Sequence, residues 1–119
     1  MNTIETLDKK AAQIAAQFAD LRTTLAADPE FFGQFQISVQ CYINPEVSFH
    51  LTDDQRHLAP AICQRFGLVQ IKRKVMHGPP VDIWWVGVTA SGAEVTIFNA
   101  EALPDDELID LAKFEGGGA

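Results

Sequence analysis

The chain has 119 residues, of which 47% are apolar and 21% charged, and its formal net charge at pH 7 is −7. This length suffices for one compact core without disulfide or metal staples, and the composition excludes a disordered chain. The acidic balance, which by itself helps to keep a small protein in solution, disfavours non-specific binding to nucleic acid or anionic membrane and favours a basic partner.

A helix of about six turns is predicted at the start of the chain. Its apolar residues recur at steps of three and four, at Ile4, Leu7, Ala11, Ile14, Phe18, Leu21 and Leu25. Asn2 and Glu5 can form a capping box, and Asp28-Pro29 ends the helix and begins a short segment through Phe32. The stripe also has the spacing of a coiled-coil seam between two chains, although three heptads favour packing on a sheet.

A hairpin follows, because the apolar period changes from helical to two. The first strand alternates at Phe35, Ile37, Val39, Cys41 and Ile43, and the second at Val47, Phe49 and Leu51. Asn44-Pro45-Glu46 supplies the turn. A three-residue loop pairs Ile43 with Val47, Cys41 with Phe49 and Val39 with Leu51, which keeps every apolar partner on one side.

A helical segment is predicted between Thr52 and Phe66, with Thr52 and Gln55 as a capping box and Gly67 as the C-terminal cap. Pro60 interrupts the segment. Either the helix kinks there, or a turn over residues 53–57 precedes a shorter helix with Pro60 in its first turn.

Three strands are expected over residues 68–76, 81–89 and 93–99, followed by a short helix over 104–114. The order predicts an α+β fold with a mainly antiparallel sheet of about five strands, in the order α-ββ-α-βββ-α, and with helices chiefly on one face. Residues 1–115 form the single predicted domain and 116–119 a flexible glycine-rich tail. Which strands are neighbours stays open, although the hairpin and the meander can share one sheet.

Strand register locates the candidate interaction face. A two-residue turn at Ser91-Gly92 pairs Val88 with Val95, and a four-residue loop at 77–80 pairs Met76 with Val81. Lys72 then lies opposite Trp85, and Lys74 opposite Ile83, away from the core. The predicted interaction face comprises Lys72, Lys74, Ile83, Trp85 and Phe98. An aromatic surface flanked by lysines can bind another protein or stack single-stranded bases, unless the C-terminal helix covers it.

A small-molecule pocket is the alternative site. By the same register, Arg73, Trp84 and Asn99 converge at the end of an apolar sheet face. This arrangement would suit a ligand-binding domain or an enzyme whose site is assembled from distant residues.

The motifs of common catalytic and metal sites are not found in this sequence. Phosphate-binding glycine loops are missing, and Cys41 and Cys63, which lack a flanking signature, are expected to be buried thiols. His50, Asp53 and His57 could hold a metal, but their spacing matches no zinc pattern. No cofactor and no metal are therefore predicted.

These observations favour a small acidic, non-enzymatic protein-interaction module of the adaptor, inhibitor or chaperone-like kind, acting alone or as a homodimer. The predicted partner is another protein, while nucleic acid is disfavoured and no membrane contact is expected. The first residues lack the pattern of a secretory signal and no stretch reaches membrane-spanning length, so a cytoplasmic location is expected.

Overall fold

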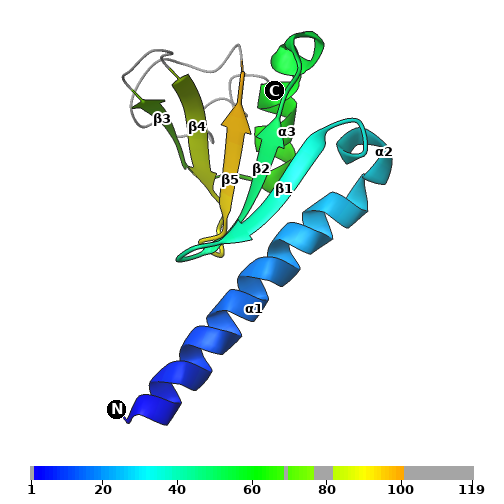
Figure 1. The fold of residues 1–119 in the computed structure, drawn as a ribbon. Coiled ribbons are helices and arrows are strands. Elements are labelled where there is room, and N and C mark those ends of the chain that lie inside the picture. Colours follow the sequence, from blue (N-terminus) through cyan, green and yellow to red (C-terminus); the bar gives the residue numbers. More distant parts are fainter. Residues whose placement is uncertain (1, 69, 77–81, 101–119) are drawn as a thin grey trace.

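The computed structural model describes residues 2–68, 70–76 and 82–100, and it has an α+β fold (Figure 1). Within these residues the elements are α1 (Thr3–Ala27), α2 (Pro29–Phe32), β1 (Gln36–Cys41), β2 (Pro45–His50), the 3-10 helix η1 (Asp53–Leu58), α3 (Ala59–Phe66), β3 (Gln70–Met76), β4 (Asp82–Val88) and β5 (Glu94–Phe98). This order confirms the predicted fold class. The helix predicted at 104–114 and the tail at 116–119 lie outside the described residues.

The described strands form one five-stranded sheet in the order β1-β2-β5-β4-β3. The pairs β1–β2, β4–β5 and β3–β4 are antiparallel, while β2 and β5 run parallel at the centre. The hairpin and the meander are therefore joined by one parallel seam, which an all-antiparallel reading of the strands would miss.

Most helix termini follow the predicted chemistry. The Asn2 side chain accepts a hydrogen bond from the backbone N–H of Glu5 at 2.8 Å. Asp28 caps α2 with Pro29 in its first turn. Of the two readings for residues 52–66, the second is confirmed: η1 precedes a shorter α3 that has Pro60 in its first turn and ends at left-handed Gly67 (φ 58°).

The core lies on one face of the sheet, and the helical segments supply its other half. Phe32, Phe49 and Phe66 pack against one another with ring centroids 5.4 to 5.9 Å apart. The strands add Val47, Ile71, Trp85, Val95 and Ile97, and the helices add Leu21, Ala59, Ile62 and Cys63.

The register of β4 differs from the prediction. Thr89 N–H donates to the carbonyl of Ala93, and Gly92 adopts φ 89°, so the β4–β5 loop has three residues rather than two. Val86 consequently pairs with Thr96, not with Ile97. Because side chains alternate, this single step turns the described β4 side chains, from Trp84 to Val88, to the opposite face of the sheet.

The register of the first hairpin is also shifted, with a different result. Val39 pairs with Val47 and Cys41 with Pro45, so the predicted Cys41–Phe49 pairing is wrong. The shift is an even number of residues and keeps each side chain on its predicted face. The strand ends at Cys41, however, and Ile43 lies outside it.

Candidate functional site

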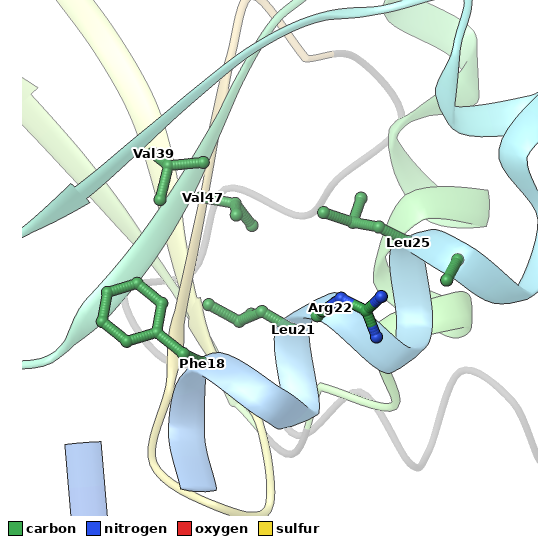
Figure 2. Close-up of a pocket in the computed structure, with 7 residues that line it drawn as sticks. Phe18, Leu21, Arg22, Leu25, Val39 and Val47 are labelled. Atoms are coloured by element: carbon green, nitrogen blue, oxygen red, sulfur yellow. The ribbon is translucent and has the colours of Figure 1, made fainter. Parts of the chain in front are cut away.

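The described part of the chain contains an apolar groove between α1 and the β1–β2 hairpin. Its volume is about 350 Å³. Figure 2 shows the helix residues Phe18, Leu21 and Leu25 facing Val39 and Val47 of the strands. Its lining is completed by Arg22 and Ala26. The groove is thus apolar except for one guanidinium.

The N-terminal half of α1 continues the same stripe beyond the body of the protein. In Figure 1 the helix extends well past the ends of the strands. Ile4 and Leu7 are 70% and 62% exposed, whereas Leu21, further along the same stripe, is 2% exposed. We call residues 3–16 the free half of α1. Ile4 and Leu7 have no core to pack on among the described residues, whereas Ile14, nearer the body of the protein, is half-buried.

Polar contacts fix the point where α1 leaves the body. Gln17 is 1% exposed, and its Nε2 donates to the carbonyl of Ser91 at 3.1 Å and to Oδ1 of Asn44 at 3.4 Å. One turn on, Asp20 accepts hydrogen bonds from the hydroxyls of Thr89 and Ser91. Both hairpin loops are thereby tied to the middle of the helix.

The rim of the groove is also apolar and exposed. Val39 is 61% exposed, and Tyr42 and Ile43 at the hairpin tip are 84% and 75% exposed. The predicted burial of Val39 is therefore wrong. The reason is that β1 is an edge strand and that α1 diverges from it, which leaves the end of its core face uncovered.

The face of the sheet opposite the core carries a row of rings. His50 stacks on Phe98 with ring centroids 4.9 Å apart, and Trp84 lies next to Phe98 at 6.0 Å. The His50 Nε2 is 3.1 Å from the hydroxyl of Ser38. Lys74 pairs with Trp84 across the strands, and its side chain is exposed. We call this surface the polar face.

Two carboxylates lie together on the polar face. Glu46 of β2 and Glu94 of β5 are paired across the parallel seam. Partial burial raises the pKa of Glu94, and the negative charge of Glu46 raises it further, while Lys74 acts in the opposite direction. Glu46 also accepts a hydrogen bond from the hydroxyl of Ser48 at 3.1 Å.

The predicted interaction face is divided between the two sides of the sheet. Lys72 and Lys74 are exposed, and half-buried Phe98 lies on the polar face with them. Trp85 is 7% exposed and belongs to the core, because the register shift of β4 places its side chain on the core face. Arg73, and not Lys72, pairs with Trp85 across the strands. Ile83 pairs with Val75, not with Lys74. Trp84 takes the place that was predicted for Trp85.

The predicted pocket residues are not brought together. Arg73 lies on the same side of the sheet as Trp85, and Trp84 points to the polar face. Asn99, at φ 62°, donates its side-chain amide to the carbonyl of Leu51 and to Asp53. It therefore closes the end of β5 onto the η1 turn and does not face Trp84.

The two thiols occupy different environments. Cys63 is buried as expected, and burial raises its pKa to about 12. Cys41 is exposed, so its predicted burial is wrong. Of the residues considered for a metal, His50 contacts Ser38 and Phe98, and Asp53 accepts a hydrogen bond from Asn99. The described ranges contain no cluster of three or more His, Cys, Asp or Glu that could hold a metal.

Sequence reasoning missed the groove. The sequence predicts two apolar stripes there, one on the helix and one on the strand, and the structure confirms the period of each. The useful signal was the length of the helical stripe, which spans more turns than a six-residue strand can cover.

Comparisons with protein-family models, with curated proteins and with solved structures found no match to this chain. No helix in the described residues is long and apolar enough to cross a membrane.

Proposed function

We propose that this protein is a non-enzymatic protein-interaction module that binds an amphipathic helical segment in the groove between α1 and the β1–β2 hairpin. The observation that carries the proposal is that the groove is lined almost wholly by apolar side chains, of which Val39 is 61% and Phe18 39% exposed. An apolar groove of this kind suits the apolar face of a helix, whose side chains at steps of three and four enter it. The adaptor, inhibitor and chaperone-like classes all use such binding.

The energetics favour binding at this groove. Burying one large aliphatic side chain contributes about 1.5–3 kcal/mol, so three or four such contacts supply most of a micromolar affinity before the cost of association. The groove is supported by buried Leu21 and Val47 and by the Gln17 and Asp20 contacts. Its walls are therefore ordered before binding, which lowers the entropic cost.

The test uses a displayed library of peptides with amphipathic helical patterns, selected on the purified protein. The expected binders carry apolar residues at helical spacing and lose at least tenfold in affinity on Val39→Glu, which puts a charge into the groove from an exposed strand position. Gln36→Glu adds the same charge on the opposite face of β1 and should leave affinity unchanged. Binders without an apolar stripe, or an unaffected Val39→Glu variant, would refute the proposal.

A second candidate function is single-strand nucleic-acid binding on the polar face. The row formed by His50, Phe98 and Trp84, with Lys72 and Lys74 beside it, has the composition of a base-stacking surface. The neighbouring Glu46 and Glu94 oppose phosphate binding, which ranks this function second. Quenching of Trp84 fluorescence by a pyrimidine oligonucleotide at low salt would support it, and an unchanged spectrum there would eliminate it.

We also propose a cytoplasmic location. Cys41 is an exposed free thiol, of the kind that a reducing compartment maintains.

A further inference from the structure

The free half of α1 matches the groove at the other half of the same helix. We propose that two copies of this chain bind each other reciprocally, with the free half of each α1 lying antiparallel in the groove of the other copy. This inference rests on the proposed function and names its partner as a second copy. The helical segment that the groove accepts is then residues 3–16.

The geometry of one helix serves both contacts. With a twofold axis passing near Ala15, Ile4 of one copy lies level with Ala26 of the other, and Leu7 lies level with Thr23, within the stretch that lines the groove. The axial distance from Ala15 to either end of α1 is about 18 Å. Such a contact is isologous, since one axis fills both grooves and leaves no free end to extend into a fibre.

The charges favour the antiparallel direction. Asp8, Ala15 and Arg22 are seven residues apart and lie along one edge of the stripe, and both Asp8 and Arg22 are exposed. An axis at Ala15 places Asp8 of each copy opposite Arg22 of the other, which makes two opposite-charge pairs. A parallel arrangement would place each of these charges near its own counterpart.

The charge balance of α1 also favours a second copy over a basic partner. The helix carries three acidic and three basic side chains, so it is neutral in a chain of net charge −7. A basic protein would be attracted to the remainder of the molecule. The neutral, apolar helix is the region where two acidic chains repel each other least.

The middle of the helix permits close approach. Two positions of the stripe or its edge near the proposed axis are alanines, at 11 and 15, and both are exposed. Interaxial distances depend on the side chains at the contact, and alanine allows the shortest ones that ordinary helices reach. Bulky Phe18 would lie level with Ala12 of the other copy.

The first test measures the molecular mass by sedimentation equilibrium. The protein concentration is varied over about two decades, from about 1 to about 200 µM. We expect a dimer, and we expect a monomer for Ile4→Ser with Leu7→Ser. Both residues are exposed in one copy, so circular dichroism should show that the fold is retained. The control, Thr6→Ser with Gln13→Ser, changes the opposite face and should remain dimeric. A monomeric wild type at 200 µM would overturn the inference.

The second test determines direction through cysteine cross-linking in a Cys41→Ser background, which leaves only buried Cys63. A mixture of Asp8→Cys and Arg22→Cys chains should form a disulfide between positions 8 and 22, and neither variant should link efficiently to itself. Self-linking of each variant alone would mean a parallel pair and would overturn the antiparallel arrangement.

Charge reversal provides an independent measure. Asp8→Arg should raise the dimer dissociation constant about tenfold, because two attractions become repulsions. Asp8→Arg combined with Arg22→Asp should restore it. An Asp8→Arg dimer as tight as wild type would contradict the pairing.

The outcomes separate this inference from the function on which it rests. A monomeric wild type whose peptide binding is still abolished by Val39→Glu would refute self-association and leave the proposed groove function in place. A dimer that is unaffected by Val39→Glu would refute the reciprocal arrangement, and peptide binding that is also unaffected by Val39→Glu would refute the proposed groove function as well.

Discussion

Gln17 and Ser91 are 74 residues apart in the chain, and the side-chain amide of the first donates a hydrogen bond to the carbonyl of the second at 3.1 Å. This contact joins α1 to the β4–β5 loop, and the same nitrogen reaches Asn44 in the β1–β2 loop. A buried amide therefore sets the direction in which the free half of α1 leaves the body. Any partner that binds this helix depends on that direction.

Replacement of Gln17 by alanine should lower the free energy of unfolding by about 0.5–1.5 kcal/mol, because a part-buried hydrogen bond to the carbonyl of Ser91 is lost. Urea denaturation of the monomeric Ile4→Ser, Leu7→Ser background measures this without a contribution from association. The control is Gln13→Ala, on an exposed turn of the same helix, which should change stability by less than about 0.5 kcal/mol. Equal effects of the two variants would show that the Gln17 contact contributes nothing.

The adjacent tryptophans should behave in opposite ways. Trp85 is 7% exposed in the core, so Trp85→Ala should cost about 3–5 kcal/mol, while Trp84→Ala on the polar face should cost clearly less. Acrylamide quenching separates them without large disruption, using Trp84→Phe and Trp85→Phe. We expect the fluorescence of Trp84 to be quenched more strongly. Stronger quenching of Trp85 would mean that the β4 register described above is wrong.

Stability should depend on pH through Glu94. Its folded-state pKa is raised above the ordinary value of 4.5, so this residue disfavours folding only when it is ionised. The contribution of Glu94 to stability is therefore fully present below pH 4.5, and it is lost as the pH rises through the folded-state pKa of this residue. Glu94→Gln should stabilise the protein at pH 7 by about 0.5–1 kcal/mol, because the carboxyl is partly exposed.

The advantage of Glu94→Gln should vanish below pH 4.5, where the wild-type carboxyl is also neutral. Thermal unfolding from pH 4 to pH 8 measures the difference. Lys74→Gln should act in the opposite direction and steepen the loss of stability with pH, since Lys74 favours ionised Glu94. A constant difference between wild type and Glu94→Gln at all pH values would contradict the titration.

The two cysteines should react at very different rates. Cys41 is exposed, whereas burial raises the pKa of Cys63 to about 12, so Cys63 provides almost no thiolate at pH 8. Ellman's reagent should label one thiol rapidly in the folded protein and the second only in denaturant. The Cys41→Ser variant should show no fast phase. Rapid labelling in that variant would mean that Cys63 is accessible in the native state.

The sequence predicted the fold class well because its periodic signals were strong and local. The α1 stripe, the Asp28-Pro29 boundary and Gly67 each have one dominant physical explanation, and the structure confirms them. The register of β4 was not predictable in the same way. Residues 83–88 are apolar on both faces, so alternation could not choose between Trp84 and Trp85, and one extra loop residue decided it.

The groove could not be derived from the sequence for a related reason. Periodicity shows which side of an element is apolar, but it does not show how far the facing element extends. Val39 and Leu7 have the pattern of core residues, but Val39 is exposed because it lies on an edge strand from which α1 diverges, and Leu7 because α1 extends beyond the hairpin. A sequence can therefore indicate that a stripe needs a partner without indicating whether the partner belongs to the same molecule.

The parallel pairing of β2 with β5 has a consequence for folding kinetics. Each antiparallel hairpin closes through neighbouring residues, but the seam joins Val47 to Val95 and Phe49 to Ile97, which are 48 residues apart. The entropic cost of closing this long loop arises before the seam contacts that compensate for it can form. We therefore expect hairpin formation to be fast and docking of the two halves to be rate-limiting. Destabilising substitutions in the hairpin loops would then slow folding, because the hairpins are already formed when the two halves dock, and substitutions at Phe49 and Ile97 would slow it to the extent that the seam contacts form in that step.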